Sequence, residues 1–237
     1  MSRKRLTLKL SPESVYIGAL LSLVAGYLDA YTYIGRDGVF STAQTGNMVL
    51  LGVEAARGDF AQALVHIPPI VAFVTGVFVA EMLKHPWIVR MLVEPSRAVL
   101  LLEIIVLFGV GFLPSSVPNM VVTMMIVFVG SLQISTFRSL EGWTYNTTVT
   151  TGNLFTAARA LYISLFQKEL SASLQFKKFA TVISSFLFGA FIGTFATYRM
   201  EDKAVWIASI ILIVVFFIML VSPAKGISSE IIKRDTR

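Results

Sequence analysis

The sequence of 237 residues contains no cysteine and only two histidines, His66 and His85. The lack of cysteine excludes disulfide bonds and thiolate metal sites, and two histidines alone do not make a metal cluster. The motifs of a P-loop, a zinc protease and a serine hydrolase are absent as well. We therefore expect no metal, no cofactor and no catalytic residues, which makes an intramembrane enzyme the weakest functional interpretation.

Charged residues are also scarce, at 14%, whereas hydrophobic residues make up 55% of the chain and the mean hydropathy is +0.75. Soluble domains carry about a quarter charged residues, so much of this chain is expected to contact lipid. A helix needs roughly 20 apolar residues to cross a bilayer, and six runs come close to that length: 15–34, 63–83, 98–113, 119–137, 179–198 and 204–222. The composition thus predicts an all-α integral membrane protein whose main partner is the lipid bilayer.

The tripeptide Thr-Gly-Asn occurs twice, at residues 45–47 and 151–153, each time after an apolar run. We call these the first and second TGN segments. A helix-like sequence follows each one, so we expect a break in the chain and then a short re-entrant or interfacial helix, near 45–57 and near 151–166. Inside a membrane, the backbone of such a break must face protein or water, and the helix start would present free N–H groups.

The distribution of Lys and Arg decides between six and eight predicted spans. Six spans with a cytoplasmic N-terminus place sixteen of the 20 basic residues in the cytoplasm and leave Arg36, Arg57, Arg199 and Lys203 outside. If both TGN segments also span, the split falls to about twelve against seven and Arg159 lies in the membrane. The positive-inside rule favours six spans, an uncleaved first helix and cytoplasmic N- and C-termini. This topology explains the net charge of +6, so we expect no nucleic-acid partner.

The two halves of the chain align at three landmarks in the same order: GYLDAYTYIG (26–35) with GSLQISTFRS (130–139), the two TGN segments, and AFVTGVFVA (72–80) with SFLFGAFIG (185–193). With three spans in each half, the second half must enter the membrane from the opposite face. The sequence therefore predicts a 3+3 inverted repeat, a plan found in many secondary transporters. The predicted parts are a basic tail at 1–14, repeats at 15–114 and 118–222, and a tail at 223–237.

Together, these motifs resemble the YoaK family of bacterial multi-span membrane proteins. The pattern is G-x-x-D, then F-x-x-x-x-TGN, then G-x-x-Q and T-x-T-TGN, carried here by Gly26, Asp29, Phe40, Thr45-Gly46-Asn47, Gly130, Gln133, Thr148, Thr150 and Thr151-Gly152-Asn153. The resemblance covers roughly residues 14 to 222. It implies a multi-pass protein of the bacterial inner (plasma) membrane and leaves the activity open.

Two carboxylates lie inside predicted spans, Asp29 in the first and Glu103 in the third. Such groups are costly in a membrane and often mark ion or proton pathways, so both are candidates for coupling a proton or cation to transport. The alternative for Asp29 is structural, as a hydrogen-bond partner of a neighbouring helix or of the TGN backbone. The alternative for Glu103 is a position at the cytoplasmic interface or a pairing with Arg97. Gln133, the counterpart of Asp29, is polar but cannot ionise.

Small and basic residues suggest further contacts. Gly76 with Ala80, and Gly189 with Gly193, have a spacing of four residues, which predicts close packing of the second and fifth spans. The basic amphipathic stretch 161–178 is expected to lie along the cytoplasmic interface.

The sequence favours a small secondary transporter or facilitator for a small polar or anionic solute. The candidate solute-binding residues are Thr45, Gly46, Asn47, Thr151, Gly152, Asn153, Gln133 and Asp29. The alternative is a scaffold or assembly factor without transport, in which the TGN motifs only pack helices. The small size of the chain makes a homodimer a reasonable expectation.

Overall fold

The computed structural model describes residues 13–85, 87, 94–145 and 150–221. The tail at 223–237, most of the tail at 1–14, and Thr148 of the second motif lie outside these residues.

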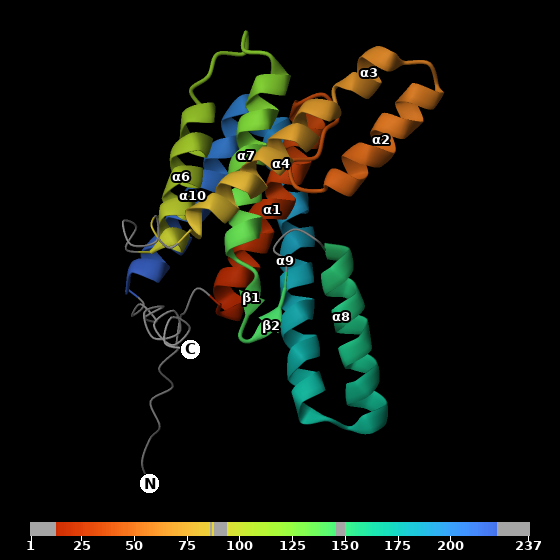
Figure 1. The fold of residues 1–237 in the computed structure, drawn as a ribbon, viewed down its shortest axis with the longest axis vertical. Coiled ribbons are helices and arrows are strands. Elements are labelled where there is room, and N and C mark those ends of the chain that lie inside the picture. Colours follow the sequence, from red (N-terminus) through yellow and green to blue (C-terminus); the bar gives the residue numbers. More distant parts are fainter. Residues whose placement is uncertain (1–12, 86, 88–93, 146–149, 222–237) are drawn as a thin grey trace.

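The described chain is largely helical (Figure 1). Its apolar bundle consists of α1 (Val15–Gly35), α4 (Ile67–Leu83), α6 (Pro95–Val110), α7 (Asn119–Thr136), α9 (Leu170–Met200) and α10 (Val205–Val221). Each of these helices overlaps one of the apolar runs that the sequence analysis identified.

By length and composition, four helical stretches of the described chain are able to cross a membrane: Val15–Gly35, Phe60–Leu83, Asn119–Thr136 and Leu170–Val221. The last contains both α9 and α10, which are separated by a 3-10 turn, η2 (Glu201–Ala204). Glu201 has a φ of 50°, and this left-handed backbone ends α9. Helix α6, with 16 residues, is shorter than these stretches.

Short elements connect the bundle helices. After α1 come α2 (Gln44–Ala56) and α3 (Phe60–Leu64). After α7 come a two-stranded antiparallel hairpin of β1 (Ser139–Leu140) and β2 (Trp143–Thr144), then α8 (Thr150–Tyr162) and a π-helical turn, η1 (Ile163–Gln167). Figure 1 shows α2 and α8 on the same side of the bundle, where they run toward opposite ends of the molecule.

The stretch 161–178 is divided between the end of α8, the turn η1 and the beginning of α9, and its position along the cytoplasmic interface stays a prediction. Lys168 adopts a left-handed backbone with a φ of 57°, which reverses the chain after η1. Residues from Leu170 onward form the beginning of α9, and Phe179 is fully buried there. Its cluster includes Leu140 of the β-hairpin and Ala157 of α8. Leu161, Leu165 and Leu170 of the stretch stay exposed, and α8 and α9 form a helical hairpin.

The first helix of each half packs along a helix of the other half. Helix α1 packs along α9, and α7 packs along α4. A Cβ atom on Gly189 of α9 would collide with the Leu23 carbonyl of α1, and one on Gly76 of α4 would collide with the Ser131 hydroxyl of α7. The glycines thus permit close helix contact, as small residues do in membranes. Their contact partners are α1 and α7, whereas the sequence analysis had paired the second span with the fifth.

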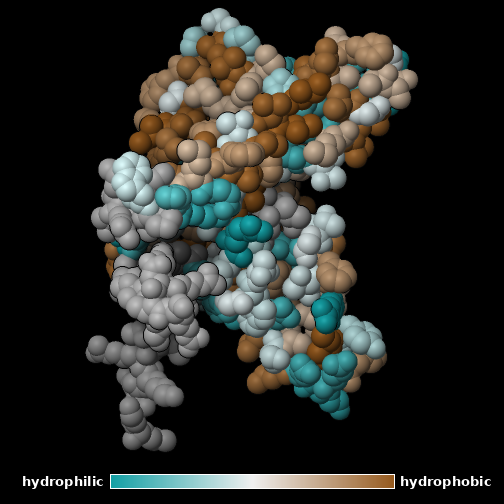
Figure 2. All heavy atoms as spheres, in the orientation of Figure 1, coloured by the Kyte–Doolittle hydropathy of each residue, from teal (hydrophilic) through white to brown (hydrophobic). Residues whose placement is uncertain are grey.

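The main core lies between α1, α6, α7 and α10, and it includes Tyr27, Leu107, Ile126 and Leu212. Many large apolar side chains on the outside of the bundle are exposed, which suits contact with lipid. In Figure 2, hydrophobic residues dominate the upper part of the face, over α4 and α6. Hydrophilic residues gather lower down and at the tip of the α8–α9 hairpin.

Candidate functional site

Asp29 holds the chain just before α2. Its Oδ1 accepts hydrogen bonds from the backbone N–H of Thr42 at 2.6 Å and from Ser41 Oγ at 3.0 Å, and its Oδ2 accepts one from Thr42 Oγ1 at 2.7 Å. Only 5% of Asp29 is exposed. Several directed donors compensate the burial of a carboxyl group. Asp29 therefore fixes the loop that leads into the first TGN segment, which is the structural role considered for it above.

Asn47 closes the same loop, residues 40–47, which we call the first elbow. Its Nδ2 donates to the Phe40 carbonyl at 2.8 Å, and its Oδ1 accepts from the Phe40 N–H at 2.9 Å. Nδ2 also lies 2.9 Å from Gln44 Oε1. The side chain is fully buried, and it pairs with the backbone in both directions, as a neighbouring strand would. Asn47 thus shapes the elbow from within.

Thr45 and Gly46 face outward instead. They line a shallow hollow of about 330 Å³ together with Tyr33, Phe40, Val49 and Leu50. A Cβ atom on Gly46 would lie 2.8 Å from the Phe40 ring, and that ring stacks on Tyr33 with centroids 4.8 Å apart. A glycine is required here because the aromatic ring lies directly over the backbone.

The second TGN segment repeats this order of burial. Thr151 and Gly152 are exposed at the start of α8, and Asn153 is buried. Helix α8 begins at Thr150 and α2 begins at Gln44, so each TGN segment lies in the first turn of its helix. Residues 146–149 lie outside the described chain, and the loop before α8 is therefore not compared with the first elbow.

Gln133 forms no hydrogen bond with Asp29 but lies within hydrogen-bonding distance of Glu103. With its amide turned so that the nitrogen faces the carboxyl group, Gln133 Nε2 lies 3.0 Å from Glu103 Oε2 and 3.3 Å from Oε1, and both side chains are buried, at 2% and 1% exposure. Glu103 therefore lies inside the helix bundle. Arg97 forms an ion pair with Glu94 and donates to the Met219 carbonyl instead. The contact between α6 and α7 brings together two predicted site residues for which the sequence offered no pairing signal.

The first elbow also reaches the second half of the chain. A Cβ atom on Gly130 of α7 would lie 3.9 Å from Thr42 Cγ2. The elbow thus lies between α1, which supplies Asp29, and α7, which supplies Gly130.

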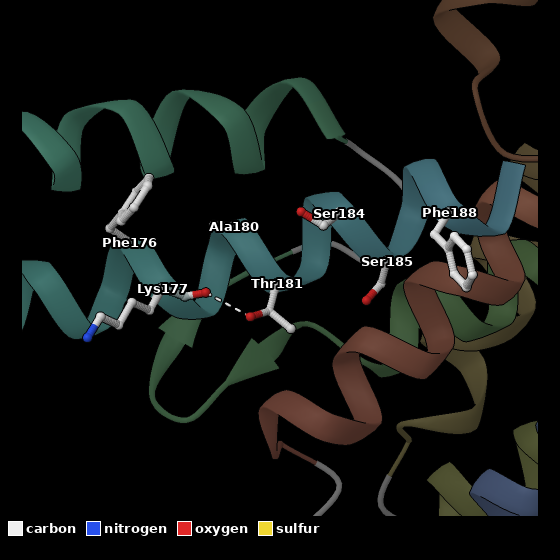
Figure 3. Close-up of a pocket in the computed structure, with 7 residues that line it drawn as sticks. All are labelled: Phe176, Lys177, Ala180, Thr181, Ser184, Ser185 and Phe188. Carbon is white, nitrogen blue, oxygen red and sulfur yellow. Dashed lines mark hydrogen bonds between the residues drawn. The ribbon is translucent and has the colours of Figure 1, made fainter. Parts of the chain in front are cut away.

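A groove along α9 was missed by the sequence analysis. It encloses about 600 Å³ and is lined by Lys177, Thr181, Ser184, Ser185, Phe176, Ala180 and Phe188 (Figure 3). Thr181 Oγ1 donates to the Lys177 carbonyl at 2.9 Å. Figure 3 shows α8 running beside this part of α9. The available signal was the spacing of Lys177, Thr181 and Ser185 by four residues, which places three polar groups on one face of an apolar helix.

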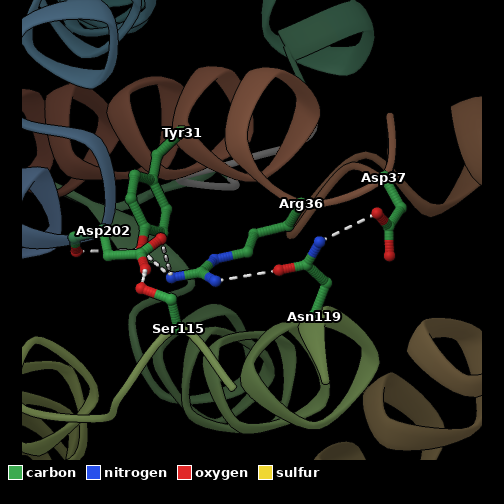
Figure 4. A network of polar contacts seen from close by, with 6 residues as sticks. All are labelled: Tyr31, Arg36, Asp37, Ser115, Asn119 and Asp202. Carbon is green, nitrogen blue, oxygen red and sulfur yellow. Dashed lines mark hydrogen bonds and ion pairs between the residues drawn. The ribbon is translucent and has the colours of Figure 1, made fainter. Parts of the chain in front are cut away.

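A polar network closes the end of the bundle at which α1 ends (Figure 4). Arg36 Nη2 pairs with Asp202 Oδ1 at 2.7 Å and donates to the Tyr31 hydroxyl at 2.8 Å, and Nη1 donates to Asn119 Oδ1 at 2.9 Å. Ser115 Oγ donates to Asp202 Oδ2 at 3.1 Å. Arg36 is 5% exposed, so its charge is held by partners from α7 and from the turn between α9 and α10.

The β-hairpin covers the opposite end, where α1 begins. The Glu141 N–H donates to the Glu13 carbonyl at 2.8 Å, and Glu141 forms an ion pair with Lys178 of α9. The Tyr145 hydroxyl donates to the Gly18 carbonyl at 3.1 Å, and burial raises the pKa of this phenol well above its usual value. Glu141 and Gly142 form the two-residue turn of the hairpin, both with positive φ, and the glycine was the signal for it in the sequence.

Comparisons with known proteins agree with the helical membrane architecture. A family model described as a protein of unknown function (DUF1275) matches residues 17–218. The chain is 23% identical over 212 residues to the UPF0700 transmembrane protein YoaK of Bacillus subtilis (strain 168), over 87% of this chain and 93% of that protein. No solved structure matches the chain.

Proposed function

The chain belongs to the DUF1275 family and is a membrane protein, and from this premise we propose that it is a small secondary transporter or facilitator for a small polar or anionic solute. In this proposal α1, α4, α6, α7, α9 and α10 each cross the bacterial inner membrane, with both termini in the cytoplasm. Helix α6 crosses with local thinning of the bilayer, because its 16 residues fall short of a full span.

The symmetry of the helix packing is the observation that carries the proposal. In the proposed 3+3 inverted repeat, α1 corresponds to α7, α2 to α8, α4 to α9 and α6 to α10. If each helix is replaced by its counterpart, the α1–α9 contact becomes α7–α4, the α6–α7 contact becomes α10–α1, and the α8–α9 contact becomes α2–α4. All six of these helix pairs pack against each other in the structure. A chain with two unrelated halves has no reason to pair its helices in this way, and inverted repeats are typical of secondary transporters.

The two TGN helices support a path between the halves. Helices α2 and α8 run toward opposite ends of the molecule, and the face in Figure 2 is hollowed between them. The polar groove on α9 lies beside α8 and offers hydroxyl groups and Lys177 to a solute. Irregular backbone at membrane depth is tolerated where it is buried in protein or lines a water-filled cavity.

The candidate site residues divide into two roles in this proposal. Thr45 and Thr151 are exposed at the helix starts and contact the solute, together with Gly46 and Gly152. Asn47 and Asn153 are buried and maintain the helix starts. A coupling role for Asp29 stays a prediction, and its three hydrogen bonds to the elbow support a positioning role.

The Arg36 network supplies the outer closure that an alternating-access carrier needs. It joins α1 to α7 through Asn119 and to the turn between α9 and α10 through Asp202, so it bridges the two proposed halves. Opening toward the outside requires the separation of Arg36 from Asp202. Domain closures of this type commonly rest on a few polar contacts that form in only one state.

The scaffold function remains the second candidate. The observation that favours it is the use of Asp29 and Asn47 to hold the first elbow, with no polar atom of Asn47 left to meet a solute. A homodimer is compatible with either function and stays a prediction.

Transport is tested in proteoliposomes, after a thermal-shift screen over small anions and polar metabolites has identified a stabilising solute. We expect Thr45→Val and Thr151→Val to lower the flux of that solute at least tenfold without lowering the melting temperature. Thr75→Val is the matched control, because Thr75 is exposed on α4 and bonds only its own helix, at the Val71 carbonyl. A folded, correctly inserted protein that binds and moves none of the solutes would favour the scaffold.

Topology is tested separately, because the chain has no native cysteine. Thr45→Cys and Thr151→Cys, at exposed positions of the two TGN segments, are expected to react with a membrane-impermeant thiol reagent from opposite sides of the membrane. Labelling of both positions from the same side would contradict the inverted repeat and with it the carrier.

A further inference from the structure

Glu103 and Gln133 form an isolated polar pair in the apolar bundle. Glu103 is on α6 and Gln133 is on α7, and both lie almost completely out of contact with solvent. Within the described chain, the side-chain amide of Gln133 is the polar group that lies within hydrogen-bonding distance of the Glu103 carboxyl group. Glu103 thus has one amide as its polar partner, whereas Asp29 accepts hydrogen bonds from three donors.

Within the part of the chain that the structure describes, no cation faces this pair. Helix α4, which meets α6 at Val99, carries Glu81, and Glu81 is exposed and pairs with Lys84. Helices α7 and α10 carry no Asp, Glu, Lys, Arg, His or Tyr. The ionisable groups of α1 in the shared core bond elsewhere: Tyr27 to the Ala204 carbonyl, Asp29 to the first elbow and Tyr31 to Arg36 and Asp202. On α6 itself, Arg97 lies six residues earlier and pairs with Glu94. An ionised Glu103 would thus be a buried charge without a counter-charge, which is strongly unfavourable.

The side-chain amide of Gln133 is able to serve either protonation state of Glu103. A protonated carboxyl group has one O–H donor, and an amide oxygen accepts from it. An ionised carboxyl group accepts from Nε2, which lies 3.0 Å from Oε2 and 3.3 Å from Oε1 when the amide is turned toward the carboxyl group.

We propose that Glu103 and Gln133 form a buried proton site. In one state Glu103 is neutral and donates its proton to Gln133 Oε1. When the proton leaves to water, the Gln133 amide rotates and Nε2 donates to the carboxylate that remains. The pair therefore has two hydrogen-bonded states that differ by one proton and one amide rotation.

The use of this site for coupling rests on the proposed function. In a proton-coupled carrier, Glu103 would bind and release the proton, and Asp29 would keep the first elbow in place. The proton site itself does not require transport, and the two claims can be tested apart.

Infrared spectroscopy of the purified full-length protein tests the protonation. At neutral pH the wild type is expected to show the carbonyl band of a hydrogen-bonded carboxylic acid, and Glu103→Gln is expected to lose this band. Glu94→Gln is the matched control at the N-cap of the same helix, because Glu94 forms an ion pair with Arg97. It is expected to retain the band. A Glu103→Gln spectrum that loses only carboxylate bands would overturn the proposal.

Gln133→Leu provides a second variant in case Glu103→Gln does not fold. Removal of the acceptor is expected to leave Glu103 neutral and to shift its carbonyl band to the position of a free carboxylic acid. An unshifted band would overturn the pairing. Flux is then measured with and without a pH gradient. Loss of the gradient response in Glu103→Gln supports coupling, whereas absence of flux in the wild type counts against the carrier and leaves the infrared result standing.

Discussion

Asp29 and Glu103 are both carboxyl groups buried in apolar helices, yet their surroundings differ. Asp29 accepts hydrogen bonds from three donors of the first elbow, and Glu103 meets one amide. The comparison shows that burial of a carboxyl group does not by itself identify a proton site. The number of donors that the fold directs at the group separates a positioning residue from a candidate proton carrier.

The largest effect is expected for Asp29→Leu. The substitution leaves the Thr42 N–H and the hydroxyls of Ser41 and Thr42 buried without their acceptor. Each unsatisfied donor costs about 1–3 kcal/mol, so the variant should lose at least about 3 kcal/mol of unfolding free energy. The melting temperature in detergent measures the loss. Asp29→Asn, which keeps one acceptor, should lie between this variant and the wild type. A Leu variant as stable as the wild type would remove the positioning role.

Asn47→Ala is expected to have the next largest effect. It removes both hydrogen bonds to the Phe40 backbone at a fully buried position, and a loss of about 2 kcal/mol is expected. The variant should destabilise the elbow and leave the carboxylic acid band of Glu103 unchanged, because the two regions share no hydrogen bond. A simultaneous change in that band would show that the regions are coupled.

Ser41→Ala tests how much a single hydrogen-bond donor to Asp29 contributes to stability. One of three donors is removed while the other two stay, so a loss of about 1 kcal/mol is expected. Chemical denaturation resolves a difference of this size when it is run beside Ser184→Ala, an exposed serine of the α9 groove that should have almost no effect. Equal values for the two serine variants would contradict a specific contact between Ser41 and Asp29.

The smallest effect on stability is expected for Glu103→Gln. If Glu103 is neutral in the folded protein, an amide of similar shape replaces it with little change. Below about pH 4, where the unfolded chain is protonated at this position as well, the unfolding free energy should therefore stay within about 1 kcal/mol of the wild type. At higher pH the unfolded wild type loses this proton and the wild type becomes less stable, whereas Glu103→Gln should lack this decrease. A loss as large as that of Asp29→Leu would mean that Glu103 is a structural carboxylate, and the contrast between the two residues would disappear.

The comparison of the two TGN segments shows which features of the structure local sequence patterns predict. The sequence predicted a short helix after each one, and α2 and α8 begin within one residue of Thr45 and Thr151. Local patterns did not reveal that Asn47 points inward to the Phe40 backbone while Thr45 faces out. Which side of a helix start is buried depends on the helices that pack against it.

The α8–α9 region was predicted least well. The stretch 161–178 has the composition of an interfacial helix, and the sequence analysis placed it on the membrane surface. The structure folds it back at Lys168, so that it forms the end of α8 and the beginning of α9, while Leu161, Leu165 and Leu170 remain exposed. Amphipathic composition indicates that one side of a helix is apolar, but it does not show where the chain reverses.

The apolar runs and the family were readable from residue order alone. A helix that satisfies its own backbone in lipid needs only length and apolar side chains, and both are local properties. The pairing of Glu103 with Gln133, the partners of Asp29, and the contacts of α4 and α9 with the first helix of the other half depended on the folded chain. These contacts join residues far apart in sequence, and close packing of several helices at once selects them from many arrangements that suit the same apolar surfaces equally well.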